Sequence, residues 1–412
     1  MRTRADEGTV RWVPRFSEIA ILVFIASAYL LETQSGAAYF GLAQGLLGAA
    51  AVGVVLVSQR PSSGILVPWS AALLVLASTA VVISGGAITP EFRTFAINCI
   101  VGVALFQLMR DDRLVTVAIS SLGLAGSISA ITLISAFDMG AAAATPVTAA
   151  WELRMGASLP GSNPNIAGLY LAISFCASLS RAFVPRAQRS ARVLWGVCSV
   201  LTLFAISLTG SRKALIYCGV AAIILVAYFS RRLLPLVAIA IAAGGWALIN
   251  VDWLYVVVGH RLVGEGGVAE SDGLRVTAAF EAVDAILAAP LGTGWGSSGR
   301  FLADLGYTHS NYLEVLVSVG LLGLVVYYSL HVLVISRWRR VSPAVRPAVM
   351  AFMVSGLTVD IFQVTYLYKG PMIVLALGAA AAMSIRESEV GVARTVGLDA
   401  GSRLRARRRI GA

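Results

Sequence analysis

The sequence predicts an all-α integral membrane protein with about twelve transmembrane helices and one long exported loop that contains short interfacial helices. Of its 412 residues, 58% are hydrophobic and only 13% are charged, whereas a soluble chain carries about 45–50% apolar and about 25% charged residues. Apolar runs recur along the chain with short polar breaks, and Lys and Arg gather in alternate breaks. These numbers exclude a soluble globular enzyme and a disordered chain, since disorder requires low hydrophobicity and high charge.

Each apolar run approaches the length of about 20 residues that carries a helix across a bilayer, where a helix satisfies its own backbone hydrogen bonds. The first run follows Arg11 and Arg15 as a signal peptide would, but it continues past the small residues Ala26-Ser27-Ala28, so we expect a span. The twelve expected spans are residues 16–31, 38–57, 65–84, 92–109, 114–137, 165–180, 193–209, 214–229, 233–250, 311–335, 345–364 and 371–385.

The orientation follows from the distribution of Lys and Arg, which accumulate on the cytoplasmic side of a membrane. With the N-terminus inside, 24 of the 32 Lys and Arg residues lie on the cytoplasmic side, and this bias also accounts for most of the net charge of +11. The charge therefore gives no support to a nucleic-acid partner, and we expect membrane lipids as the surrounding partner instead. The predicted organisation is a cytoplasmic N-terminal segment (1–15), spans one to nine (16–250, with an exported loop at 138–164), a long exported loop (251–310) where a site could be built, spans ten to twelve (311–385) and a basic cytoplasmic tail (386–412).

Eight cations are placed on the exported side, against the insertion bias, and they are the first candidates for a binding site. Arg212 and Lys213 are the clearest pair, because they lie in a short turn between two spans with no acidic residue nearby in the sequence. One interpretation is that they anchor a helix end by reaching to the membrane surface. The other is that they bind an anion, since guanidinium donors suit phosphate oxygens. The eight cations are Arg93, Arg154, Arg212, Lys213, Arg261, Arg275, Arg300 and Lys369.

The long exported loop contains two recognisable segments. Apolar side chains at Val276, Phe280, Val283 and Leu287 recur at helical spacing and predict a helix along the membrane surface, with Arg275 at its start. The glycine-rich stretch 292–296 lacks the preceding strand and the Gly-Lys-Ser/Thr ending of a nucleotide loop. We expect a tight turn there, in which Trp295 could stack on a sugar ring.

His309 is the candidate general base, because it lies where the exported loop re-enters the membrane and can meet water and a lipid-borne substrate together. A neutral imidazole with a pKa of about 6.5 accepts a proton near the working pH. His331 falls inside a span and is expected to be a packed helix residue, and His260 a loop residue. A metal site is the competing role, for which Glu270 and Asp272 are the available pair of carboxylates, but such a site needs several convergent ligands, and we expect no metal.

Three motifs together resemble the O-antigen ligase and O-antigen polymerase family of polytopic membrane glycosyltransferases, over about residues 154–328. Arg154 followed by residues 161–165 (Gly-Ser-Asn-Pro-Asn) is similar to the family's stretch that enters the sixth span. Residues 209–215 (Thr-Gly-Ser-Arg-Lys-Ala-Leu) resemble its Thr-Gly-Ser-Arg turn. The most specific motif comes last: Pro-Leu-Gly-Thr-Gly at 290–294, then His309-Ser310, nine residues, Gly320, two residues and Gly323.

The resemblance implies transfer of a glycan from an undecaprenyl-diphosphate-linked donor to the hydroxyl of a glycan or lipid-linked acceptor, on the exported face of the bacterial cytoplasmic (inner) membrane. The reaction would invert the anomeric carbon and need neither a metal nor another cofactor. In this sequence it implies that Arg212 and Arg275 bind the diphosphate and that His309 acts on the acceptor. Lys213 and Arg154 are the further candidates for binding the diphosphate. The ligases often carry Arg-x-x-x-Leu, whereas Arg212 is followed by Ile216 and Arg275 by Ala279, so ligase and polymerase both stay open.

Two other functions fit a polytopic membrane protein. A secondary transporter of a polysaccharide precursor would carry ionisable residues near the bilayer midplane, where only Asp360 with Gln363 lies deep in a predicted span. A non-catalytic partner of a glycan export system would tolerate substitution of His309. Glu314, one turn after His309, either orients the imidazole or is an ordinary helix residue.

The charge pattern generates a test of topology. Both termini should be cytoplasmic and the segment 251–310 exported, because 24 of 32 cations then lie inside. A cysteine introduced near Gly266 should react with an impermeant thiol reagent in intact cells, and a cysteine in the tail should be protected. Protection near Gly266 together with labelling of the tail would reverse the orientation.

Overall fold

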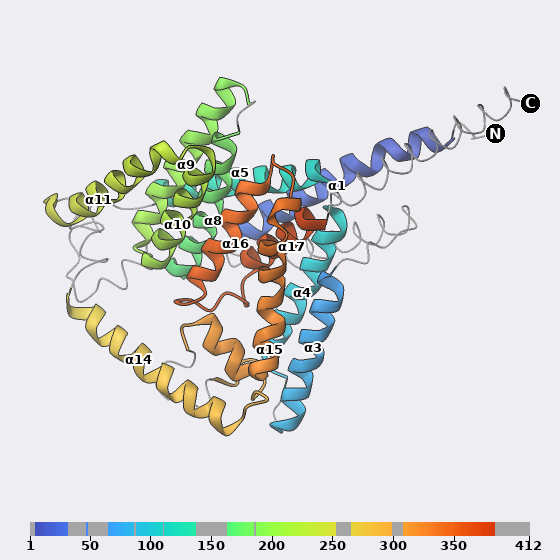
Figure 1. Cartoon of the computed structure of the whole chain (residues 1–412), viewed down its shortest axis with the longest axis vertical. Helices are drawn as coiled ribbons and strands as arrows, with labels where there is room; N and C mark the ends of the chain where they lie inside the picture. Colours follow the sequence, from blue (N-terminus) through green and yellow to red (C-terminus); the bar gives the residue numbers. More distant parts are fainter. Residues whose placement is uncertain are drawn as a thin grey trace, which may run out of the picture.

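A computed structural model of the chain describes residues 5–31, 47, 65–85, 88–109, 111–136, 163–184, 187–252, 265–298 and 308–383. These residues form twelve α-helices and two short 3-10 helices, and they contain no β-strand (Figure 1). The α-helices are α1 (Ala5–Leu31), α3 (Leu66–Ile83), α4 (Pro90–Leu108), α5 (Asp112–Ala136), α8 (Pro164–Ala182), α9 (Arg189–Thr209), α10 (Arg212–Phe229), α11 (Leu234–Asn250), α14 (Glu265–Ala288), α15 (Asn311–Ser336), α16 (Arg346–Val359) and α17 (Lys369–Met383). The 3-10 helices are η2 (Arg231–Leu233) and η5 (Trp338–Arg340).

The predicted spans agree with the helices in most places. Eleven of the twelve predicted spans coincide with an α-helix, and the second, 38–57, lies outside the described residues except for Leu47. Within the described part of the chain, six helices are long and apolar enough to cross a membrane, namely α3, α4, α5, α9, α10 and α15. The fold is therefore the expected all-helical architecture of a multi-pass membrane protein, while the count of twelve spans stays a prediction.

Helix α8 is the centre of one bundle and packs against α5, α9 and α10. Its contact with α5 is close because small residues face each other, as is common between helices in membranes. A Cβ atom added at Gly126 of α5 would collide with the Ser174 side chain of α8, and one added at Gly123 would lie 2.8 Å from Ser178 Oγ. The bundle therefore depends on small side chains that let backbones approach.

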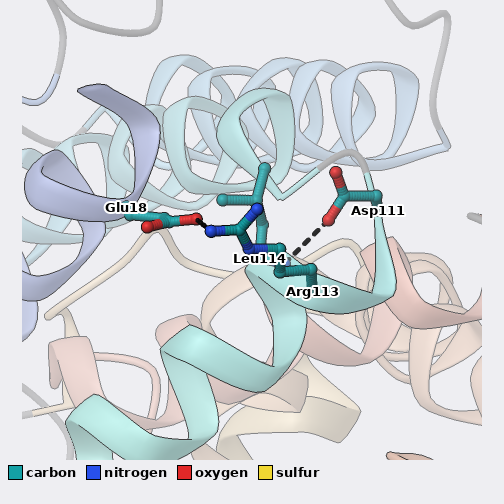
Figure 2. A network of polar contacts seen from close by, with 4 residues as sticks. All are labelled: Glu18, Asp111, Arg113 and Leu114. Carbon is teal, nitrogen blue, oxygen red and sulfur yellow. Dashed lines mark hydrogen bonds and ion pairs between the residues drawn. The ribbon is translucent and has the colours of Figure 1, made fainter. Parts of the chain in front are cut away.

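Helix α1 is attached to this bundle at both ends of its apolar part. Glu18 of α1 and Arg113 of α5 form an ion pair with 2.7 Å between Oε1 and Nη2, and Asp111 Oδ1 accepts a hydrogen bond from Leu114 N at the start of α5 (Figure 2). At the other end, Tyr29 donates a hydrogen bond to the Tyr170 carbonyl of α8 at 3.0 Å. Arg113 is 70% exposed, so the pair contributes little to stability, about 0–1 kcal/mol, and mainly fixes orientation.

Helix α15 is not the single straight span that the sequence predicts at 311–335. Asn311 Nδ2 lies 3.0 Å from Tyr328 Oη, and the rings of Tyr312 and Tyr328 stack with centroids 4.4 Å apart. In a continuous helix such residues would be separated by about 25 Å, at about 1.5 Å per residue. The chain instead folds back at Gly320, whose φ of 69° and ψ of −175° are not helical. The result is a helical hairpin with a first arm (311–319) and a second arm (321–336).

The start of the first arm meets the ends of other helices at one level of the bundle. The backbone N–H of Asn311 donates to the Asp360 carbonyl just after α16 at 2.8 Å, and Asn311 Oδ1 accepts from Thr365 N at 2.9 Å before α17. The turn between α9 and α10 packs on the start of α8, where a Cβ atom at Gly168 would lie 2.8 Å from Ser211 Cβ. Helix α14 crosses below this region in Figure 1 and packs against α15. These are the ends that the sequence predicts to be exported.

The hairpin generates the second prediction. With cysteines at Tyr312 and Tyr328, a short bismaleimide should join the two positions in membranes, because their side chains are in contact across the hairpin. A control pair at Ala191 and Ser207, with the same sequence separation in the continuous helix α9, should not react. Mass spectrometry of the peptides measures both yields. Equal yields from the two pairs would show that α15 does not fold back.

Candidate functional site

The loop that follows α14 lies along the first arm of α15. The backbone N–H groups of Thr293 and Gly294 donate to the carbonyls of Val317 and Ser318, each at 2.9 Å. These two chains approach so closely that a Cβ atom at Gly292 would lie 2.6 Å from Ser318 O, and a Cβ atom at Gly320 would collide with Pro290 O. Both glycines also have positive φ values, 91° and 69°. The glycines of the motif are therefore needed to seat the loop against the hairpin.

Trp295 lies in this loop and is fully buried. Its ring packs against Phe95 and Tyr366, with centroids 4.5 Å and 4.3 Å away, and its carbonyl accepts a hydrogen bond from Thr89 Oγ1 at 2.6 Å. Other side chains of the protein cover the indole ring and leave no surface for a sugar. The sugar-stacking role predicted for Trp295 is therefore not part of our proposal. The sequence suggested a platform because Trp295 follows glycines in a loop, but an aromatic ring beside glycines serves equally well to fill a packed interior.

His309 has an unusual backbone conformation. Its φ is 57°, and it is the one residue other than glycine with a positive φ in the described part of the chain. Such a conformation costs about 1–3 kcal/mol for a residue with a Cβ atom and persists where neighbouring contacts enforce it. Thr308 supplies these contacts, because its Oγ1 donates to the Ser310 carbonyl at 2.8 Å and accepts from Ser310 N at 3.3 Å. Strain of this kind is common at functional sites.

The residues after His309 are held by a buried polar network that the sequence did not reveal as a unit. The Asp360 carboxylate accepts hydrogen bonds from Asn311 Nδ2 at 3.3 Å, from Tyr328 Oη at 2.9 Å and from Thr365 Oγ1. The signal was present, since an acidic residue deep in an apolar run is costly and usually functional. The sequence did not reveal the hairpin, which brings Tyr328 to the Asp360 carboxylate.

The turn between α9 and α10 presents cations at a helix start. Gly210 ends α9 in the left-handed conformation, with a φ of 62°, and Ser211 Oγ accepts from Ala214 N to cap α10. Arg212 and Lys213 are the first two residues of α10 and are half-buried. The N-terminus of a helix carries partial positive charge and free N–H groups, so the turn combines two features that attract anions.

Helix α14 covers the residues where the periodicity predicts a helix, but it is one helix of 24 residues that begins at Glu265, so Arg275 is not at its start. Val276, Phe280 and Leu287 are exposed, while Ala278 and Ala282 are buried on the opposite face. An exposed apolar face of this kind suits a helix that lies at a membrane surface. Arg275 is half-buried near the middle of this helix.

The site brings together His309, Lys213 and Arg275 from three separate segments. The pKa of His309 is lowered from its usual value of 6.5 to about 4, first by burial of the imidazole and then by the positive charges of Lys213 and Arg275. Like charges shift a pKa in this way only when the groups lie near one another, because each cation disfavours the protonated imidazole. Arg212 adjoins Lys213 at the start of α10, and Arg154 lies outside the described residues.

Nothing in the described part of the chain groups three His, Cys, Asp or Glu side chains as a metal site would. Glu270 and Asp272, the carboxylates considered for a metal, are in α14, but their side chains are outside the described set.

The comparison with known families agrees with the motifs. Residues 197–328 match the sequence model of a family described as O-antigen ligase, so the predicted resemblance is confirmed for this segment. The matched segment runs from α9 to Tyr328 and contains Lys213, Arg275 and His309. It supports a membrane protein that takes part in glycan transfer during polysaccharide assembly. No curated protein matches the chain.

The depressed pKa of His309 generates the third prediction. Diethyl pyrocarbonate reacts with neutral imidazole. As the pH is lowered, the rate of His309 modification should therefore fall with a midpoint near pH 4 and not near pH 6.5. Lys213→Met removes one positive charge and should move the midpoint upward. Mass spectrometry of the peptide that contains His309 measures the rate. A wild-type midpoint at 6.5, unchanged by Lys213→Met, would show that burial and the cations do not act on this histidine.

Proposed function

We propose that the protein transfers a glycan from an undecaprenyl-diphosphate carrier to an acceptor hydroxyl on the exported face of the bacterial inner membrane, with inversion and without a metal. The observation that carries the proposal is the convergence of His309, Lys213 and Arg275 inside the segment that matches the O-antigen ligase family. A proton acceptor beside two cations is what this transfer needs. In the proposal both termini are cytoplasmic.

The cations bind the donor and stabilise its departure. A diphosphate is a good leaving group, so the protein needs to neutralise the charge on the departing oxygen and not to protonate it. Arg275 supplies a planar fork of N–H donors that matches phosphate oxygens, and Lys213 supplies a point charge at the start of α10. Arg212 beside it and Arg154, which the sequence predicts to be exported, complete the proposed set.

His309 activates the acceptor. The imidazole takes the proton of the acceptor hydroxyl, the hydroxyl oxygen forms a bond to the anomeric carbon, and the bond from that carbon to the diphosphate oxygen breaks on the opposite face. The electron pair leaves with the diphosphate, and the configuration inverts because the hydroxyl oxygen attacks the face opposite the departing diphosphate. Bound diphosphate also offsets the charges of Lys213 and Arg275, so the pKa of His309 rises and the imidazole becomes a stronger base when the donor is present.

The exposed apolar face of α14 gives the site access to a lipid-linked donor. With Val276, Phe280 and Leu287 in the membrane interface, Arg275 on the same helix is held at headgroup depth. The diphosphate of a polyprenyl carrier occupies that depth because its chain is apolar and its head is charged. This placement is the reason to prefer a lipid-linked donor over a soluble nucleotide sugar.

Two acceptors fit this chemistry, a growing polysaccharide and a lipid-linked core. A strain that lacks the protein distinguishes them, because loss of the polymerase shortens the glycan chains and loss of a ligase leaves full-length chains on the carrier. Analysis of lipid-linked and surface glycans gives the answer. Unchanged chains in both fractions would contradict a transferase in this assembly and favour a non-catalytic partner.

Different substitutions test the proposed base and the proposed diphosphate-binding cations. His309→Ala should lower turnover by about 10²–10⁴-fold with donor affinity nearly unchanged, because a general base acts in the transition state. Arg275→Lys keeps the charge but loses the bidentate geometry, so donor affinity and turnover should both fall, as should those of Arg212→Lys. Turnover and donor affinity are measured on purified protein in proteoliposomes.

The exposed cation Arg93 at the start of α4 provides the matched control, and Arg93→Lys should keep both parameters. Full turnover in His309→Ala would remove the proposed base. Full turnover in both site Lys variants, at normal membrane levels, would reduce Arg212 and Arg275 to topology anchors.

A further inference from the structure

Glu314 is a buried carboxylate that the proposed chemistry does not use. It lies on the first arm of α15 and is 1% exposed. A buried carboxylate is expensive unless strong donors surround it. Glu314 Oε1 accepts from Ser298 Oγ at 2.7 Å, and Oε2 accepts from Thr308 N at 3.1 Å and lies 3.2 Å from Thr308 Oγ1.

These donors come from two separated points of the chain. Ser298 is the last described residue after α14, and Thr308 is the residue directly before His309. The Glu314 carboxylate therefore links these two segments by hydrogen bonds beside the site. Neither contact involves the His309 side chain.

Thr308 passes this constraint on to His309. Its backbone N–H is fixed by Glu314, and its hydroxyl bonds both backbone groups of Ser310, the residue on the other side of His309. Thr308, which Glu314 anchors, therefore fixes the backbone on both sides of His309, whose φ is 57°. A strained residue keeps such a conformation only when its neighbours over-determine it.

We propose that Glu314 is a positioning residue, which acts through Thr308 to hold the strained backbone of His309 so that the imidazole faces the acceptor. The inference rests on the proposed function, because it assigns Glu314 a part in the work of His309. Glu314 itself takes no proton and touches no substrate.

The chemistry of the contacts separates this role from a charge effect. Glutamine has the same shape, and its carbonyl oxygen can accept from Thr308 N while its amide donates to Ser298 Oγ, since a hydroxyl both donates and accepts. Glu314→Gln should therefore keep the hydrogen bonds and the position of His309. Glu314→Leu has a similar volume, keeps none of the hydrogen bonds, and should release Thr308.

The test measures turnover on purified protein in proteoliposomes and His309 modification by diethyl pyrocarbonate in membranes. Glu314→Leu should lower turnover by about 10–100-fold, the cost of displacing a catalytic group by about 1 Å, and should raise the modification rate of His309. Glu314→Gln should restore both values to near those of the wild type. Asp284→Asn, at an exposed acid of α14, is the matched control and should change neither.

Thr308 gives a second route that does not depend on the folding of Glu314→Leu. Thr308→Val should lower turnover as Glu314→Leu does, whereas Thr308→Ser should not. In the double variant of Glu314→Leu with Thr308→Val, the loss of transition-state stabilisation should be smaller than the sum of the losses in the two single variants. Wild-type turnover in Glu314→Leu or in Thr308→Val, or a Gln variant as impaired as Leu, would overturn the positioning role. If His309→Ala is itself active, the proposed function fails instead, whatever Glu314 does.

Discussion

The reversal of α15 at Gly320 is the constraint on which the site depends. Because the chain turns there, Asn311 and Tyr328 reach the same carboxylate of Asp360, and the segment that carries His309 is anchored to the turn between α16 and α17. The same reversal exposes the carbonyls of Val317 and Ser318 to the loop that follows α14. A side chain at Gly320 would collide with that loop, so glycine at this position serves both the fold of the hairpin and the seating of the loop.

The electrostatics of the site follow from that geometry. The hairpin holds His309 where burial and the charges of Lys213 and Arg275 keep its imidazole neutral at a pKa of about 4. Such a base is weak on its own. An anionic donor between the cations restores its strength, so in our account the donor prepares the base and an acceptor gains little reactivity before the donor arrives. The strengthened base can act on the acceptor only if the imidazole is held in place, which is the part we assign to Glu314 through Thr308.

The sequence allowed most helices to be predicted, because apolar runs in lipid leave few alternatives to a helix. It also allowed His309, Lys213 and Arg275 to be named, since cations on the exported side and a histidine at a membrane entry are unusual in type and place. It did not reveal the hairpin, because an apolar run of 25 residues looks alike whether it crosses the membrane or folds back. It misjudged Trp295, whose burial depends on Phe95 and Tyr366 from distant segments. Glu314 and Asp360 were visible as acids in apolar surroundings, but their partners come from the tertiary fold.

We propose that His309, Lys213 and Arg275 form one site that moves a glycan from a lipid diphosphate to a hydroxyl. The most direct measurement is the anomeric configuration of the new linkage, by nuclear magnetic resonance, after incubation of the purified protein in proteoliposomes with a polyprenyl-diphosphate-linked oligosaccharide, an acceptor and a chelator of divalent metals. Our account predicts a product with inverted configuration whose formation is insensitive to the chelator. A retained configuration, loss of product with the chelator, or movement of the donor across the membrane without transfer would contradict it.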